Sequence, residues 1–200
     1  MTIPGAISDL EKALTRLPGF GRRSASRAAL ALVRERERLL TPLVDALVAA
    51  RDQVRACSRC GAFTVVGRDP CDLCTDPTRE SAALCVVEES ADILSIEATG
   101  AFHGRYHALG GKLSPARRMG PERLRLADLV DRVVREGVTE VVLALSTDME
   151  GDATAGYVTE LLRGTGARVT RLAFGLPADS GVAYSDPLTL RRALIHRVES

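Results

Sequence analysis

The 200-residue sequence predicts an α/β fold class within a multidomain α+β chain, and three observations carry this prediction. The first 56 residues contain two apolar patterns of helical period around a proline-glycine turn. Four cysteines then follow within eighteen residues, from Cys57 to Cys74. Across residues 80–176, short apolar runs alternate with helical patterns, which is typical of a parallel sheet with right-handed crossovers. Residues 177–200 add a loop and a terminal helix.

The composition and charge of the chain argue against several classes of protein. The formal net charge is +1, which excludes a polybasic nucleic-acid binder over the whole chain, but the first 56 residues carry ten Lys and Arg against six Asp and Glu. No apolar run approaches the roughly 20 residues of a membrane span. The N-terminus also lacks the pattern of a signal peptide. We therefore expect a cytoplasmic protein without a membrane partner.

The N-terminal 56 residues predict a helix-hairpin-helix element. A Pro-Gly-Phe-Gly turn at 18–21 separates two helical patterns, and the second, at 22–33, is rich in Ala and Leu. Gly19 and Gly21 would let the backbone approach a phosphate closely, and free N–H groups at the start of the second helix would face that anion. The basic residues beside this turn are Arg22, Arg23 and Arg27.

Contacts of this kind go to the phosphate backbone, so the predicted ligand is DNA without sequence preference. Arg23 and Arg27 lie one turn apart and share a helix face. An ordinary helix–turn–helix connection with solvated arginines is the alternative, and the sequence leaves it open.

The four cysteines form two Cys-x-x-Cys pairs, which are Cys57 with Cys60 and Cys71 with Cys74. Each pair turns its sulfurs to one side, and two facing pairs can hold one Zn²⁺ through four thiolates. All four positions are filled, so the predicted site is structural and has no open position for a catalytic water. Two disulfides are the alternative, although nothing in the sequence points to an oxidising compartment. The fifth cysteine, Cys85, lies in an apolar run and is expected in the core.

Four apolar runs are the predicted strands, at 84–87, 106–109, 140–145 and 169–173. The predicted helices of this region lie at 91–99, 121–136 and 153–163. Proline positions also predict two helix starts, one at Pro121 and one at Thr41-Pro42, where Thr41 would be the N-cap of a third helix. A loop at 175–181 and a terminal helix at 188–198 complete the chain.

Acidic residues follow two of the predicted strands. They are Glu88, Asp148, Glu150 and Asp152. The carboxyl ends of parallel strands meet in the usual ligand crevice of an open α/β sheet, so these carboxylates could together hold Mg²⁺. Helix N-capping is the alternative, because Asp148, Glu150 and Asp152 lie just before a helix.

No catalytic residue is predicted. The stretch 110–114 resembles a nucleotide-binding P-loop but lacks the required earlier glycine, since Tyr106 stands in that position. His103 and His107 have no Ser or Cys nucleophile beside them, and we expect both to be structural or exposed.

Taken in their order along the chain, these motifs closely resemble those of the RecR family of bacterial recombination mediators. The residues that carry the resemblance are 17–21 with the arginine-bearing helix, the four-cysteine knuckle, 86–89, 105–111, 150–154, 175–177, 184–186 and 188–194. The helix-hairpin-helix alone is a weak signal, whereas its order with the cysteines and the α/β region is specific.

This resemblance implies a non-enzymatic DNA-binding scaffold in recombinational repair, associated with the nucleoid. Such a scaffold helps load recombinase onto single-stranded DNA with the partners RecO and RecF. The resemblance implies sequence-independent binding of single- and double-stranded DNA at positions matching Arg23 and Arg27. It also implies a homodimer or homotetramer, a Toprim-like partner-binding region at 80–176, and subunit contacts through 177–200.

One departure bears on catalysis. Catalytic Toprim enzymes present a Glu after the first strand and an Asp-x-Asp after a later one. Glu88 and Asp148 fit this pattern, but Ser146 occupies the first Asp position, which weakens a Mg²⁺ site. A Mg²⁺-dependent Toprim nuclease or another phosphoryl-transfer enzyme on DNA is the alternative function. A helix-hairpin-helix glycosylase is disfavoured by the α/β half.

Overall fold

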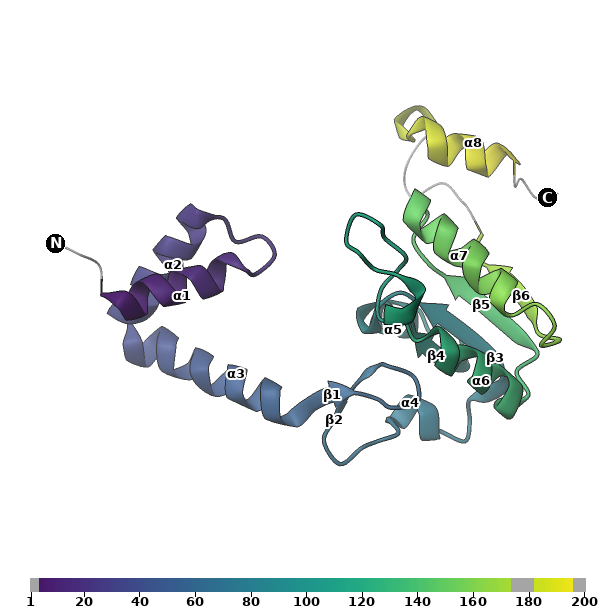
Figure 1. Cartoon of the computed structure of the whole chain (residues 1–200), viewed down its shortest axis with the longest axis horizontal. Coiled ribbons are helices and arrows are strands. Elements are labelled where there is room, and N and C mark those ends of the chain that lie inside the picture. Colours follow the sequence, from purple (N-terminus) through teal and green to yellow (C-terminus); the bar gives the residue numbers. More distant parts are fainter. Residues whose placement is uncertain (1–3, 174–181, 196–200) are drawn as a thin grey trace. The chain divides into compact units, whose positions relative to one another are not determined.

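The structure is a computed structural model that describes residues 4–173 and 182–195. The chain divides into two compact units, Met1–Arg55 and Ala56–Ser200, which are described separately (Figure 1). The predicted loop at 175–181 lies outside the described residues, as do the last residues of the predicted terminal helix and much of the segment 177–200. No helix in the described part of the chain is both long enough and apolar enough to span a membrane.

The first unit is helical, as the sequence predicts. Its α-helices are α1 (Gly5–Thr15), α2 (Arg22–Arg34) and α3 (Thr41–Gln53). Ala25, Ala29 and Leu32 are the buried residues of α2, which packs against α1. Gly19 has φ +80°, a conformation that L-residues with side chains rarely adopt, so the tight turn between the two helices depends on glycine there.

The start of α3 differs from the prediction. Residues Arg36–Leu40 form a π-helical turn that leads directly into α3, and the N–H of Thr41 donates to the carbonyl of Arg36. Thr41 has helical dihedral angles, φ −58° and ψ −53°. An N-cap needs a non-helical backbone, so the predicted N-cap role of Thr41 is wrong. The preceding helical turn already supplies the acceptor that a capping side chain would have replaced.

The second unit alternates strands and helices, which confirms the predicted α/β class. Its elements are β2 (Phe63–Val65), α4 (Asp72–Thr75), β3 (Glu80–Val87), α5 (Ser90–Glu97), β4 (Gly104–Ala108), α6 (Leu126–Glu136), β5 (Glu140–Ala144), α7 (Met149–Leu161), β6 (Arg168–Arg171) and α8 (Pro187–Ile195). The short strand β1 (Val54–Ala56) pairs with β2 in a two-stranded sheet.

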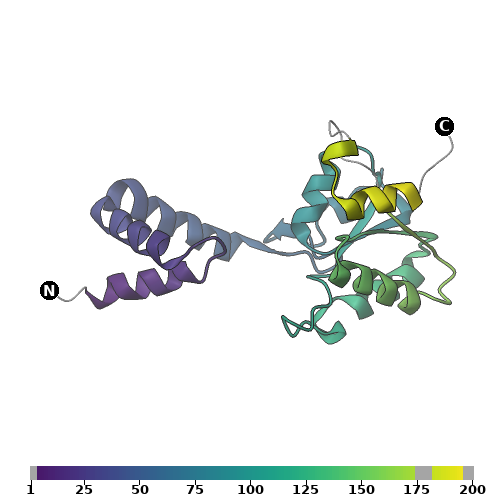
Figure 2. The same ribbon diagram turned by 90° about the horizontal axis from the view of Figure 1, so that it is seen from above.

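The main sheet has four parallel strands in the order β4-β3-β5-β6. Helices cover both of its faces (Figure 2). Its central strand β3 is buried on both faces. Leu84 and Val86 join the core formed with α6 and α7, whereas Cys85 and Val87 join the core that contains the four other cysteines and α5. Successive side chains of a strand point to opposite faces, so one apolar run serves two cores.

The helix predicted from Pro121 begins later, at Leu126. Residues Pro121–Arg123 form a single 3-10 turn, and Leu124 is extended with φ −101° and ψ 151°. The N–H of Arg125 then donates to the carbonyl of Leu109 at 2.9 Å, which fixes the chain against the end of β4 before the helix can start. This long-range bond overrides the local signal of the proline.

Two glycines in the second unit give a matched test of packing. A Cβ added to Gly104 would lie 2.6 Å from the backbone oxygen of Ala83, whereas one added to Gly156 in α7 would meet nothing within 4 Å. We expect Gly104→Ala to lower the free energy of unfolding by about 1–3 kcal/mol through overpacking. Gly156→Ala should raise it by up to about 1 kcal/mol because Ala is the better helix former. Denaturant unfolding measures both, and equal effects of the two substitutions would contradict the packing described.

Candidate nucleic-acid interface and metal centre

The hairpin between α1 and α2 presents an uncapped helix start beside free positive charge. Gly21 is the N-cap of α2 with extended backbone, φ −82° and ψ 169°, and no side chain caps the helix. The first N–H groups of a helix have no intrahelical acceptor and face outward with the positive end of the helix dipole. Added Cβ atoms at Gly19 and Gly21 would meet nothing within 4 Å, so the backbone here is open to an approaching group.

The three arginines predicted to bind DNA are all exposed. Among the described residues, Arg22, Arg23 and Arg27 have no ion pair or side-chain hydrogen bond, unlike Arg34 and Arg38, which pair with Glu35. Their guanidinium groups are therefore available for an anion. An unpaired guanidinium beside an open helix N-terminus is the arrangement that phosphate binding requires.

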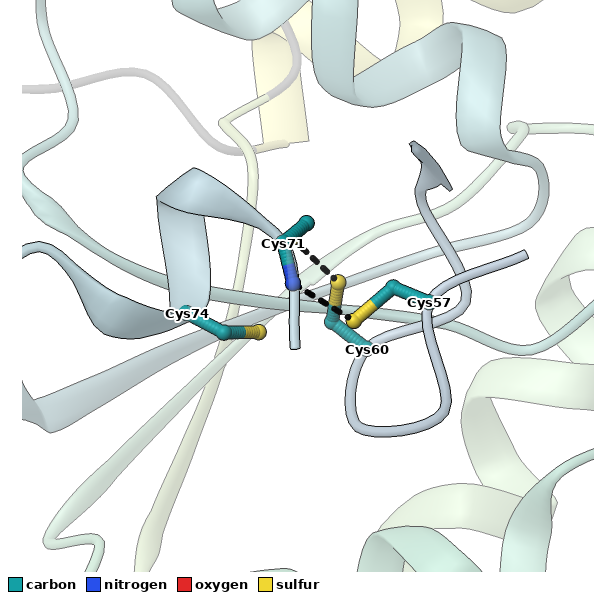
Figure 3. A group of neighbouring side chains, drawn as sticks. All are labelled: Cys57, Cys60, Cys71 and Cys74. Atoms are coloured by element: carbon teal, nitrogen blue, oxygen red, sulfur yellow. Dashed lines mark hydrogen bonds between the residues drawn. The ribbon is translucent and has the colours of Figure 1, made fainter. Parts of the chain in front are cut away.

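The four predicted metal ligands come together. Their sulfurs all lie within 4.8 Å of one another, and all four residues are buried. Figure 3 shows Cys57 and Cys60 on one turn and Cys71 and Cys74 around the short helix α4, with the four sulfurs directed toward one point. The Sγ atoms of Cys60 and Cys71 are 3.5 Å apart. This is far longer than a disulfide bond of about 2.05 Å and near the roughly 3.8 Å that tetrahedral Zn–S bonds of 2.3 Å impose.

The surrounding backbone favours thiolates over thiols at part of this cluster. Burial works to raise the pKa of Cys57, but N–H groups of Cys71, Cys60 and Arg59 together lower it. Burial and the neighbouring Cys60 sulfur instead raise the pKa of Cys71 to about 12. Thiols packed this closely cannot all ionise without a cation among them. The cluster can hold a metal ion, and four thiolates are a donor set that fits Zn²⁺.

Two sets of hydrogen bonds hold the cysteine region in place. Within it, the N–H and Oγ of Ser58 both donate to Asp69, at 2.9 and 3.0 Å, and so link the two cysteine pairs. Toward the sheet, the N–H of Ala108 donates to the carbonyl of Cys60 at 2.7 Å. The N–H of Phe63 donates to Ser90 Oγ at 2.6 Å, at the start of α5. The cysteine region is therefore packed against the sheet and hydrogen-bonded to it.

A partly buried ionic cluster that sequence reasoning missed joins the turn of the first cysteine pair to the sheet and α6. Glu136 of α6 accepts from Arg59 at 2.9 Å, from Arg105 at 3.2 Å and from Arg132 at 3.0 Å. Burial alone would raise the pKa of Glu136, but these arginines lower it. Arg132 and Glu136 are four residues apart on α6, a spacing that the sequence shows, but Arg59 on the cysteine turn and Arg105 on β4 are joined to them only by the fold.

Each of the predicted acidic residues at the strand ends contacts another residue of this chain. Glu88 accepts from the N–H of Ser146 at 2.7 Å, and Asp148 caps α7 by accepting from the N–H of Gly151 at 2.8 Å. Glu150 accepts from Ser114 Oγ, and Asp152 pairs with Arg171 and Arg192. Of the residues that the structure describes, the four cysteines are the group whose ligand atoms gather closely enough for a metal ion, and the acidic residues do not form a second one.

Lys112 lies among these carboxylates, and no sequence pattern indicates its position there. Its Nζ bonds to Asp148, lies 2.9 Å from Ser146 Oγ and lies 3.9 Å from Glu88. The ammonium group thus provides positive charge within reach of both acidic strand ends. It comes from the loop after β4, which the parallel topology brings to the same edge of the sheet.

Neither His103 nor His107 forms a catalytic arrangement. His103 is exposed. His107 is fully buried and its Nε2 contacts the carbonyl of Arg125 at 2.8 Å, while burial lowers its pKa to about 4. A neutral, packed imidazole without a neighbouring nucleophile is structural, as expected.

Comparisons with known proteins agree with this geometry. A family model described as RecR, helix-hairpin-helix matches residues 7–51, and one described as Toprim domain matches residues 82–173. The Recombination protein RecR of Chelativorans sp. (strain BNC1) is 47% identical over 191 residues, which cover 96% of this chain and 94% of that protein. The protein of the same name from Methylocella silvestris is 46% identical over 193 residues, with 96% and 95% covered. That from Bifidobacterium longum is 43% identical over 196 residues, with 98% and 97% covered.

The contact between Lys112 and Asp148 can be tested by titration. The hydrogen bond from Lys112, followed by that from the Gly151 N–H, lowers the pKa of Asp148 to about 2. In Lys112→Met we expect this pKa to rise toward the ordinary value of about 3.9 and to stop short of it, because the Gly151 N–H remains. Carbon NMR of the carboxyl group against pH measures the change.

The lowered pKa of Asp148 determines how the contribution of this pair to stability changes with pH. The contribution of the pair is present above about pH 4, the ordinary pKa range, and is lost as the pH falls toward 2. Lys12→Met is the matched control, since Lys12 is the other lysine of the chain and pairs with Asp9. An unchanged Asp148 midpoint in Lys112→Met would contradict the contact.

Proposed function

Because the chain belongs to the RecR family of recombination proteins, we propose that it acts as a non-enzymatic DNA-binding scaffold in recombinational repair. Family membership supports the role in repair. We propose further that the protein helps load recombinase onto single-stranded DNA. Its four regions would be a DNA-binding arm at 1–56, a zinc finger at 57–74, a Toprim-like partner-binding region at 80–176 and an oligomerisation segment at 177–200.

The observation that carries the DNA-binding role is the unpaired charge at the start of α2. Exposed Arg22, Arg23 and Arg27 surround helix N–H groups that no side chain caps. Such a site offers charge and backbone donors but nothing that reads a base, so binding to single- and double-stranded DNA would be independent of sequence. The glycines at 19 and 21 keep the approach open.

Replacing both Arg23 and Arg27 with Ala tests this role. Each lost phosphate contact should reduce the slope of log K against log salt by roughly 0.9 on duplex DNA and by roughly 0.7 on single strands. We therefore expect weaker binding at every salt concentration and a slope lower by about 1.4–1.8. Fluorescence anisotropy with labelled oligonucleotides of two unrelated sequences measures both quantities.

The control removes the same charge from the same unit at a distance from the hairpin, with Arg36→Ala and Arg51→Ala. An equal loss of DNA affinity in the control would mean that binding depends only on the net charge of the unit. Unchanged binding in the Arg23 and Arg27 variant would overturn the assignment of the hairpin as the DNA site.

We propose that the metal of the four-cysteine cluster is a structural Zn²⁺, one per chain. The cluster shares a core with Cys85, Val87 and Tyr106 of the sheet, so losing the metal should loosen that face of the second unit. We expect close to one equivalent of zinc by elemental analysis. Cys60→Ser should lose most of it and unfold at lower temperature, because metal binding contributes folding free energy.

Cys85→Ala is the matched control for this test. Cys85 is also buried but does not belong to the cluster, so its substitution should keep the zinc and cost only packing energy. Less than about half an equivalent of zinc in freshly purified, unchelated protein would count against the site.

We propose that the Toprim-like region binds protein partners, RecO and RecF, and does not carry out phosphoryl transfer. Lys112 supports this, because its ammonium group already pairs with Asp148 and lies 3.9 Å from Glu88, the two carboxylates that a catalytic Mg²⁺ would need as ligands. Nicking of supercoiled plasmid by the pure protein with Mg²⁺, lost in Glu88→Gln, would instead favour the Toprim nuclease.

A homodimer or homotetramer is the oligomeric state that we propose. Its support is the exposed apolar surface of α3, where Leu43, Val44, Leu47 and Val48 are 38–61% exposed. Apolar side chains clustered on one helix in this way mark an interaction surface.

A further inference from the structure

A small pocket in the second unit lies between the turn of the first cysteine pair and α6. Its volume is about 110 Å³. Its charged lining residues are Arg59, Arg125, Arg132, Arg135, Asp128 and Asp131. A more open pocket of about 480 Å³ shares Ser58, Arg59 and Arg135 with it and gives access from solvent. Four guanidinium groups line the pocket against the carboxylates of Asp128 and Asp131, and Glu136 pairs with two of the arginines, so a net charge of +1 remains (four minus three).

Arg132 supplies a buried donor to this pocket that no described residue satisfies. The residue is 1% exposed. Its Nε donates to Glu136 at 3.0 Å and its Nη1 to the carbonyl of Tyr106 at 2.5 Å, but Nη2 has no partner among the described residues. A buried guanidinium N–H without an acceptor is unfavourable, and more so than a neutral one. The Arg132 side chain also lines the pocket, so its guanidinium group contributes positive charge there.

Arg125 adds a second such donor. Its Nε pairs with Asp128 at 3.1 Å and its Nη2 donates to the carbonyl of Ser58 at 2.7 Å. Its Nη1 is buried and lacks a partner within the described part of the chain. Asp128 is thus engaged by Arg125, and Glu136 by Arg59 and Arg132, whereas Arg135 forms no ion pair among the described residues. Arg135 is exposed at the shared opening and completes the positive lining.

We propose that this pocket binds a small oxyanion with the chemistry of phosphate. Planar guanidinium groups match the oxygens of a phosphate in pairs, and charge-assisted bonds of this kind are short and strong. The volume is well below the roughly 300–1,000 Å³ of pockets for larger ligands, so the site accepts a single phosphate group and not a whole nucleotide. That group comes either from free orthophosphate or from the DNA backbone.

The site is separate from the hairpin, since no residue is shared between them. Failure of the hairpin arginines to bind DNA would therefore leave the pocket untouched. Conversely, loss of phosphate binding here would leave the proposed scaffold function intact.

The first experiment titrates the zinc-loaded, full-length protein with inorganic phosphate at constant ionic strength, following thermal unfolding and heat of binding. Phosphate should raise the unfolding midpoint in proportion to the logarithm of its concentration once the site is saturated. Arg135→Gln should weaken phosphate binding about tenfold, since one charge-assisted contact is lost. Arg123→Gln, an exposed arginine of the same unit outside the pocket, should change nothing.

The second experiment distinguishes the two sources of phosphate through the salt dependence of DNA binding. If the backbone of DNA occupies the pocket, Arg135→Gln should lower the slope of log K against log salt by about 0.9 and Arg123→Gln should not. A phosphate response with an unchanged slope assigns the pocket to free phosphate. No phosphate response together with equal slopes in both variants overturns the proposal, as does an equal effect of the two substitutions in both experiments.

Discussion

The burial of β3 on both faces is the constraint on which the second unit depends. Leu84 and Val86 contribute to the core beneath α6 and α7, while Cys85 and Val87 contribute to the core that contains the four clustered cysteines. The cysteine region is therefore not an independent finger that could open without consequence. Any change in the four thiolates reaches the sheet through shared apolar contacts, because closely packed cores transmit small displacements.

The ionic cluster around Glu136 adds specificity to this packing. Three guanidinium groups, from Arg59, Arg105 and Arg132, surround one carboxylate whose side chain is 13% exposed. Charges buried in this way stabilise little in total, because desolvation offsets their attraction, but removing one partner leaves the others uncompensated. The cluster thus favours one way of docking the cysteine turn onto α6 over sliding alternatives. The excess positive charge that it leaves is what gives the neighbouring pocket its preference for anions.

The sequence could predict the features whose signals are local. The cysteine spacing, the glycine turn before Arg22 and the apolar run at 84–87 each predicted a feature that the structure contains. The two errors have different causes, one in the residues directly before the element and one in a distant residue. Thr41 follows a helical turn that the nearby sequence does not predict. The start of α6 is fixed by the hydrogen bond from the N–H of Arg125 to the carbonyl of Leu109. The contacts of Lys112, and those of Glu136 with Arg59 and Arg105, could not be predicted either, because these partners lie 31 to 77 residues away.

Lys112 also shows how a parallel sheet can keep acidic strand ends without metal chemistry. The topology brings the ends of β3 and β5 to the same edge of the sheet, so Glu88 and Asp148 both lie near the Lys112 ammonium group. Two carboxylates so placed repel unless a cation lies near them. A lysine from the loop after β4 supplies that charge and ties the loop to the sheet by the same contacts. An ammonium group satisfies the electrostatic requirement but offers no Lewis acidity and no place for an attacking water. Such an edge suits a surface that must hold its shape while other molecules bind it.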